Sequence, residues 1–203
     1  MIISTLTGSI PAFSSVQSNL DEILIYDNRL SGGLTDFFSV PPTRLAQVDF
    51  ENNWLSGRIP DSIDWHTHVT SLEYLILANN VLTGALPTTQ RLLTSTETFF
   101  QFYLNRLTGN VPTQFGRLTR VREIAGGANT LSSRIPSELG LLSNPSSLFL
   151  GSNRLTGTVP PELASLPALE LLFLQGNNFL DRRLELLICQ KGPVRWAENG
   201  LCG

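Results

Sequence analysis

Few residues in this chain have the types and spacing that catalysis or metal binding requires. His66 and His68 stand beside Asp64 in the stretch DWHTH, where two imidazoles and a carboxylate could in principle hold a metal ion. No cysteine lies near them in the sequence, so a solvated polar loop explains this stretch better than a metal site. The chain contains no G-x-S-x-G, P-loop, G-x-G-x-x-G or H-E-x-x-H motif. We therefore expect no enzymatic activity, no metal ion and no cofactor.

Charge and composition narrow the class of protein further. Arg117, Arg120 and Arg122 form a short basic run in GRLTRVRE, but the formal net charge of the chain is -3, so we interpret the run as a solvated surface. No nucleic-acid partner is expected. A hydrophobic content of 41% in 203 residues suffices for a folded core, and 16 Gly and 12 Pro indicate many short elements separated by turns. The sequence shows no membrane-spanning run and no signal-peptide pattern.

The elements that would position functional residues are set by a repeat. An Asn recurs with steps of 25, 27, 25, 24, 24 and 24 residues, preceded by an apolar-x-apolar step and followed two residues later by Leu or, once, Phe179. The template L-x-L-x-x-N-x-L predicts one short strand per unit, with parallel strands about 4.8 Å apart. A buried Asn amide would satisfy backbone groups that the sharp turn after each strand leaves without partners. The predicted ladder consists of Asn28, Asn53, Asn80, Asn105, Asn129, Asn153 and Asn177.

A second pattern, L-[ST]-G-x-[IVL]-P, follows many of these Asn residues, for example at 107–112 and 155–160. Together the two patterns resemble plant-type leucine-rich repeat proteins, and the resemblance extends from residue 6 to about residue 179. The resemblance implies an α/β solenoid: a right-handed arc with a parallel concave β-sheet, a second short strand after many turns, and short 3-10 or helical segments on the convex side. It also implies a non-enzymatic recognition module, as in receptor ectodomains or secreted polygalacturonase inhibitors, that binds a protein or peptide.

Three units depart from the pattern. The second, LSGGLTDFFSVPP, lacks the apolar-Pro pair at its usual place, and the sixth has Ser133 where Gly usually stands. Gly126 takes an inward strand position, so we expect a thinner core there unless neighbours close the gap. The long step from Asn53 to Asn80 comes from added residues on the return side, which should bulge the convex surface.

Both ends differ from the middle of the chain. Ser4 and Leu6 fit the ladder positions, which puts the first residue inside a strand, so we expect the chain to be a fragment of a longer protein. The repeat decays near its other end, giving predicted domains of leucine-rich repeats at 1–182 and a C-terminal cap at 183–203. Cys189 and Cys202 are expected to form a disulfide in this cap, with two free thiols as the alternative. The disulfide would imply an extracellular or cell-surface location.

A hydroxyl side chain follows the ladder Leu in every unit except the last, where Leu180 follows Phe179, and a regular Ser/Thr array on a flat face can order water. Because an ice-binding solenoid is known among plant-type repeats, a structural or ice-binding surface protein is the alternative function. Ser or Thr at this turn is already part of the family pattern, so we favour hydrogen bonding within the second strand. The array consists of Thr7, Ser31, Ser56, Thr83, Thr108, Ser132 and Thr156.

The outward residues of the expected concave strands form the candidate binding surface. Its N-terminal part is acidic, its middle is aromatic, and its C-terminal part places aromatic residues beside Gly127 and Gly151, where missing side chains would leave a shallow hollow. Exposed aromatic residues beside a hollow are typical anchors of interfaces, although a few apolar residues could simply be exposed. The predicted ligand-binding residues are Tyr26, Asp49, Glu51, Tyr74, Phe99, Gln101, Tyr103, Phe149, Phe173 and Gln175.

Overall fold

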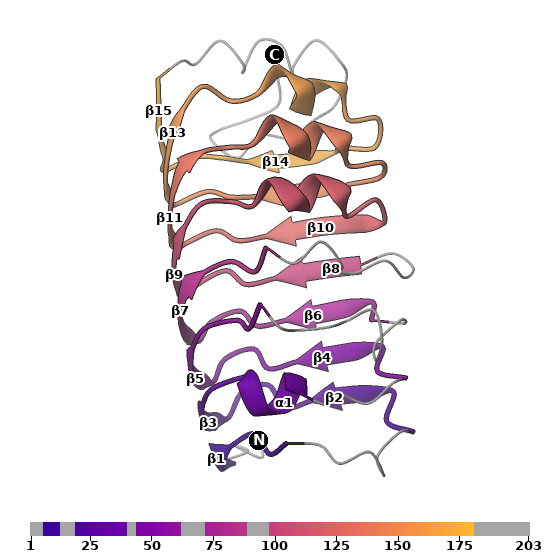
Figure 1. The fold of residues 1–203 in the computed structure, drawn as a ribbon, viewed down its shortest axis with the longest axis vertical. Helices are drawn as coiled ribbons and strands as arrows, with labels where there is room; N and C mark the ends of the chain where they lie inside the picture. The colour runs from indigo at the N-terminus through magenta and orange to yellow at the C-terminus, as the bar shows by residue number, and fades with distance from the viewer. Residues whose placement is uncertain (1–5, 13–18, 40–43, 62–71, 89–97, 181–203) are drawn as a thin grey trace.

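The chain winds into a stack of similar coils, each of which contributes strands to two parallel sheets (Figure 1). The N-terminal units lie at one end of the stack and the C-terminal units at the other, so neighbours in sequence are neighbours in space. This computed structural model describes residues 6–12, 19–39, 44–61, 72–88 and 98–180. The predicted parallel solenoid is therefore confirmed over these residues.

The apolar-x-apolar steps form a seven-stranded sheet, which we call the concave sheet because it is the one expected on that side. In each three-residue strand the central residue points inward and is buried, while outward residues such as Asp49 and Phe173 are only partly buried. The strands pair in register, apart from one irregularity between Val121 and Glu123. The strands are β2 (Glu22–Leu24), β4 (Gln47–Asp49), β6 (Tyr74–Ile76), β8 (Thr98–Gln101), β10 (Val121–Ala125), β12 (Ser147–Phe149) and β14 (Leu171–Phe173).

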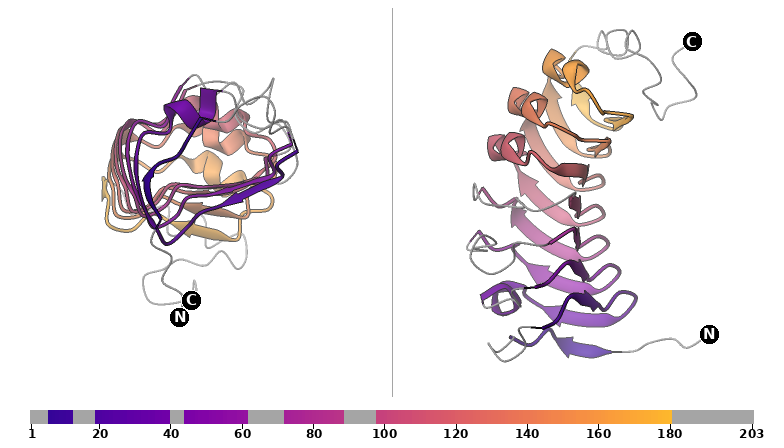
Figure 2. Two further views of the ribbon diagram at one scale, coloured as in Figure 1. Left: turned by 90° about the horizontal axis from the view of Figure 1, so that it is seen from below. Right: turned by 90° about the vertical axis from the view of Figure 1, so that its right-hand side faces the viewer.

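The residues after each ladder Asn form an eight-stranded sheet, which we call the lateral sheet. Viewed along the stack, it lies between the concave sheet and the helical segments (Figure 2, left). Its Leu residues, such as Leu107 and Leu155, are fully buried, and its Ser, Thr and Arg residues face outward. The strands are β1 (Thr7–Ser9), β3 (Arg29–Gly32), β5 (Trp54–Gly57), β7 (Val81–Ala85), β9 (Arg106–Gly109), β11 (Thr130–Arg134), β13 (Arg154–Gly157) and β15 (Asn178–Phe179).

Short helical segments close the coils on the side opposite the concave sheet. The described ones are α1 (Thr35–Ser39) and the 3-10 helices η2 (Thr113–Arg117), η3 (Ser137–Leu141) and η4 (Pro161–Ser165). Each 3-10 helix begins after a Pro that holds the chain extended, as the apolar-Pro pair predicts. The second unit, which lacks this pair, instead forms α1 and buries Phe37 and Phe38. The ring of Phe37 packs edge-on against Phe50, 5.0 Å between centroids, so aromatic residues fill this layer of the core.

The core does not thin at Gly126, because the preceding unit fills the space. A Cβ atom on Gly126 would lie 2.2 Å from Cε2 of Phe102, so the ring occupies the volume that a side chain would need. Phe102 in turn contacts Phe100, and Phe100 contacts Phe115, with centroids 4.7 and 6.0 Å apart. The packing of this layer therefore depends on the large ring of Phe102 lying against Gly126, which has no side chain.

Ser133 carries backbone strain that its equivalents avoid. Its φ is 72°, in the left-handed region, where other units have Gly, for example Gly109 and Gly157 with φ of 78°. A residue with a Cβ atom loses about 1–2 kcal/mol of stability in this region. Replacing it with Gly recovers only part of that, because Gly loses more conformational entropy on folding. We expect Ser133→Gly to raise the free energy of unfolding by about 0.5–1 kcal/mol in urea denaturation.

The neighbouring residue provides the control for this prediction. Ser132 lies in β11 outside the left-handed region, so Ser132→Gly should lower stability by about 0.5–1 kcal/mol. If both substitutions destabilise equally, the backbone of Ser133 is not strained in solution.

Candidate ligand-binding face

The ladder Asn residues hold the corner between the two sheets. Asn129 is 7% exposed, and its Oδ1 accepts a hydrogen bond from the backbone N–H of Leu107 at 2.9 Å. Its Nδ2 donates to the carbonyl oxygens of Phe102 at 3.0 Å and of Gly126 and Gly127 at 3.2 Å. Each amide thus joins its own unit to the one before. The same bridging pair of bonds occurs at Asn53, Asn80, Asn105, Asn153 and Asn177.

The residue before each ladder Asn makes the sharp turn out of the concave strand. Asp27, Asn52, Asn79 and Leu104 all have φ between 51° and 55° at this position. Nδ2 of Asn52 donates to Oδ1 of Asp27, and Nδ2 of Asn79 donates to Oδ1 of Asn52 at 3.0 Å. These three exposed polar residues form a short outer ladder beside the predicted binding surface. The repeat spacing could have identified them, because Asp and Asn tolerate this conformation better than most residues.

Aromatic residues of the concave sheet form two pairs. The rings of Tyr74 and Phe99 are parallel, with centroids 4.9 Å apart and an interplanar angle of 3°. Phe149 and Phe173 lie 4.8 Å apart with an angle of 44°. Since these residues come from β6 and β8 and from β12 and β14, the strand β10 separates the two pairs. The structure thus places four of the predicted residues as two half-buried apolar sites on one surface.

Polar residues connect the acidic part of this surface to its middle. The hydroxyl of Tyr103 donates to Oε1 of Glu51 at 2.5 Å across the intervening unit, which carries the small Ala78 at that position. Oδ1 of Asp49 accepts the backbone N–H of Glu51 at 2.9 Å. Gln101 donates through Nε2 to Oε1 of Glu123 at 2.6 Å, so Glu123 joins the site although it was not predicted as a ligand-binding residue.

Burial and mutual repulsion act on these acidic groups. Burial raises the pKa of Asp49, and the charges of Glu51 and Asp27 raise it further, while the hydrogen bond from the Glu51 backbone lowers it. Burial also raises the pKa of Glu123, against the lowering effect of the Gln101 hydrogen bond. These effects disfavour the charged carboxylates, so a cationic group of a ligand placed beside them would stabilise their ionised form.

Tyr103 should make stability fall at high pH. Burial, followed by its hydrogen bond to the Glu51 carboxylate, raises the pKa of Tyr103 from 10.0 to about 12. The unfolded chain therefore loses this proton first, and the contribution to stability is lost as pH rises from about 10 toward 12. We expect Tyr103→Phe to reduce the loss of melting temperature between about pH 9 and pH 11.5. Equal losses in the two proteins would contradict the bond between Tyr103 and Glu51.

The remaining predicted positions lie as follows. Tyr26 is 51% exposed at the N-terminal edge of the face. The expected hollow is partly filled, because a Cβ atom on Gly151 would lie 3.1 Å from Cδ of Gln175, whose side chain extends over it. Cys189, Cys202 and the DWHTH stretch lie outside the described residues. Within the described part of the chain, no group of three His, Cys, Asp or Glu residues could hold a metal ion.

Parallel strands at every unit, joined by an internal Asn ladder, define the molecule as a leucine-rich repeat solenoid. The profile of the Leucine Rich Repeat family matches residues 144–166. No curated protein sequence matches the chain. In the described residues, no helix has the length and apolar character needed to cross a membrane.

Solved structures with the same fold include plant receptors. The Arabidopsis receptor kinase HAESA, solved with the peptide hormone IDA and the co-receptor SERK1, is 30% identical with a TM-score of 0.75, over 90% of this chain and 30% of the receptor. The PEPR1–AtPEP1 structure is 26% identical with a TM-score of 0.75, over 97% and 27% of the two chains. A plant ice-binding protein shares the fold. It is 24% identical with a TM-score of 0.63, over 87% of this chain and 62% of that protein.

The chain spans less than a third of the length of these receptors. Its repeat pattern and fold are those of plant-type leucine-rich repeat proteins, and the chain is similar to these plant receptor structures.

Proposed function

We propose that the chain is a recognition module that binds an extended peptide or protein segment on its concave sheet, at the cell surface or outside the cell. Its similarity to HAESA, whose structure contains a peptide hormone and a co-receptor, supports this class of function. The observation that carries the proposal is the pair of aromatic sites, Tyr74 with Phe99 and Phe149 with Phe173, on one face. Half-exposed aromatic residues are frequent anchors of binding energy. In these receptor kinases the leucine-rich repeat ectodomain is the ligand-binding part, and we propose that this chain likewise acts by binding rather than by catalysis.

The spacing of the two sites sets the shape of the ligand. Across the strands, in the order β6, β8, β10, β12, β14, their midpoints are three strand spacings apart, about 14 Å. Phe99 pairs with Glu123 but Phe149 pairs with Ala125, so the sites are also offset by two residues along the strands, about 7 Å, which gives a separation of about 16 Å. An extended peptide covers this distance in about five residues. The ligand should therefore present two apolar side chains about five residues apart while crossing the strands diagonally.

The acidic groups set the direction of the ligand. Asp49 lies on β4, next to the strand of Tyr74 and away from the Phe149 site. A Lys or Arg at the end of the ligand nearest the first aromatic pair would face Asp49 and Glu51. This contact should affect the association rate and orientation more than the affinity.

A displayed library of extended peptides, selected on the unmodified protein, tests the proposal. We expect Phe99→Ala and Phe149→Ala each to weaken the selected peptides by about 2 kcal/mol, or about 30-fold. Leu141→Ala is the matched control, because this side chain is 66% exposed but lies on η3. Circular dichroism checks folding. Equal effects of all three substitutions, or loss of binding only with Leu141→Ala, would exclude the concave face.

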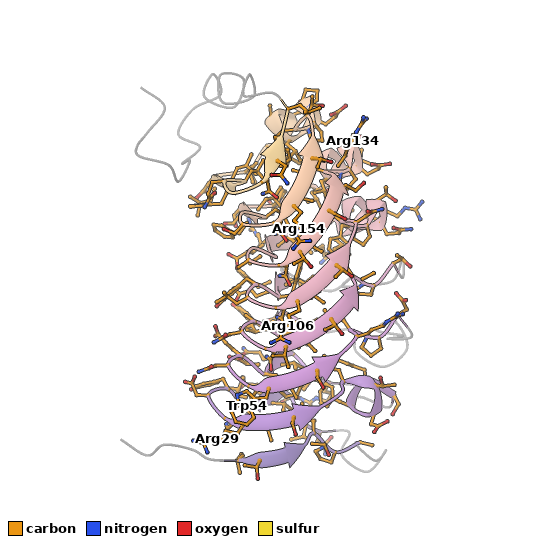
Figure 3. The ribbon with its side chains drawn as sticks, turned by 90° about the vertical axis from the view of Figure 1, so that its left-hand side faces the viewer. Arg29, Trp54, Arg106, Arg134 and Arg154 are labelled. Carbon is orange, nitrogen blue, oxygen red and sulfur yellow. The ribbon has the colours of Figure 1, made fainter. Side chains whose placement is uncertain are left out.

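The ice-binding alternative receives less support from the lateral sheet. Ser56 and Thr83 donate to the carbonyls of Gly32 and Gly57 in the preceding strands, at 3.4 Å, as expected from the family pattern. Arginines interrupt the same face (Figure 3). Charged side chains are poor templates for ordered water because they hydrate strongly. Measurable thermal hysteresis would instead favour the ice-binding function.

A further inference from the structure

The outward face of the lateral sheet concentrates positive charge in an acidic chain. Its strands contain Arg29, Arg106, Arg134 and Arg154, and Arg58 directly follows β5. The eight strands contain no Asp or Glu. All five arginines are exposed, and none forms an ion pair with a described carboxylate. The chain as a whole has a formal net charge of -3, and the acidic residues of the candidate binding site lie on the concave sheet. Positive and negative charge are therefore divided between the two sheets.

By their positions in the repeat these arginines form two columns along the stack, and Figure 3 shows Arg29, Arg106 and Arg154 of the first column and Arg134 of the second. Arg29, Arg106 and Arg154 each follow a ladder Asn directly, at the start of their strands. Arg58 and Arg134 lie at the other end of their strands. From β3 to β13 the array extends over five strand spacings, about 24 Å. A linear partner that crosses the strands could therefore contact all five guanidinium groups.

Two of these side chains are held by packing. A Cβ atom on Gly84 would lie 2.8 Å from Cγ of Arg58, and one on Gly157 would lie 2.8 Å from Cγ of Arg134. Both arginine stems thus lie across the glycine of the next unit. Since the stems are already ordered, their guanidinium groups lose less side-chain entropy when they bind an anion.

The chemistry between the columns favours a sugar polymer over a protein. Hydroxyl groups such as those of Thr83 and Thr108 stand between them, and Trp54, 60% exposed, lies beside Arg29 in the labelled view (Figure 3). Trp54 is the one large hydrophobic residue exposed in the described strands of this sheet, whereas protein interfaces have an apolar core. Single-stranded nucleic acids require several stacking aromatic residues. Hydroxyls, one indole and widely spaced guanidiniums match an acidic polysaccharide.

We propose that the lateral sheet binds a linear acidic polysaccharide, with carboxylate or sulfate groups on the arginines and a sugar ring against Trp54. Arginine pairs both groups through parallel hydrogen bonds, and release of counterions drives such association. This site is separate from the peptide site, so either proposal can fail alone.

Affinity measurements with defined polymers test the proposal on the full chain. The probes are alginate for carboxylate, dextran sulfate for sulfate, and unmodified dextran as the neutral control. We expect binding of at least one charged polymer, weakening with salt, and a loss of about tenfold or more in Arg106→Glu/Arg154→Glu. The matched control is Arg117→Glu/Arg120→Glu, which changes net charge equally at exposed positions away from this sheet and should weaken binding about twofold or less. Melting temperatures confirm folding of both variants.

Trp54→Ala and competing polyanions separate this proposal from non-specific charge attraction. The substitution should weaken polysaccharide binding while leaving its salt dependence unchanged, because no charge is lost. Equal loss in the two double variants, binding of neither charged polymer, or equally tight binding of poly-glutamate or single-stranded DNA would overturn the proposal.

Discussion

Asn129→Leu is expected to lower the free energy of unfolding by about 3 kcal/mol in urea denaturation, a large share of the stability of a domain. The Asn129 amide accepts one backbone N–H and donates to three carbonyl oxygens, and the residue is 7% exposed. Leucine has a similar volume but cannot make these bonds. The backbone N–H of Leu107 would remain buried without a partner, and water cannot reach it without opening the corner between the sheets.

Asn110→Leu provides the control for this substitution. Asn110 follows β9 and is exposed, so the same chemical change should alter stability by about 0.5 kcal/mol or less. If the two variants differ by under about 1 kcal/mol, the ladder contributes little to stability.

Gly116→Ala should destabilise the stack by about 3 kcal/mol, because the backbones of two coils are too close there to admit a Cβ atom. A Cβ atom on Gly116, in η2, would lie 2.0 Å from the carbonyl oxygen of Glu138 in η3 and 2.6 Å from its carbon. A backbone carbonyl cannot rotate away as a side chain can, so the two helical segments must separate. Thermal unfolding measures the loss, and hydrogen exchange should show faster opening of these two units.

Gly33→Ala makes the same chemical change without the clash. Its Cβ would lie 3.8 Å from the carbonyl oxygen of Ser56, an ordinary contact, and its φ is not in the left-handed region. Its effect should stay within about 1 kcal/mol. Similar losses in both variants would show that the coils can separate at η2 without cost.

The strands and coils could be predicted because each unit repeats the same physical problem. Leu172 and Leu174 point inward and Phe173 between them points outward. Asn177 follows at the point where the chain must turn. These requirements are local to one unit and its neighbours. A periodic pattern therefore contains almost all the information needed for the backbone.

The side-chain arrangement of the candidate site needed more than the pattern. Tyr103 reaches Glu51 because Ala78 between them is small, a combination of three units that no single template describes. Gln175 lies over Gly151 for a similar reason. In the second unit, which lacks the apolar-Pro pair, Phe37 and Phe38 enter the core from a helix, and Phe37 packs against Phe50. Side-chain contacts depend on which residues become neighbours and on the space that they leave.

The concave strands keep one register from Phe99 onward at the positions that carry the outward side chains, so the distance between the two aromatic pairs is adjustable in fixed steps. Ile124 pairs with Leu148 and Leu148 with Leu172, so successive strands stay aligned without a shift. Deleting one whole unit between Phe99 and Phe149 would bring the pairs closer by about 4.8 Å across the strands, and duplicating one would separate them by as much in that direction. Either change would preserve the outward direction of every remaining side chain. Gene duplication could thus set the length of the recognised peptide in increments of about one and a half residues.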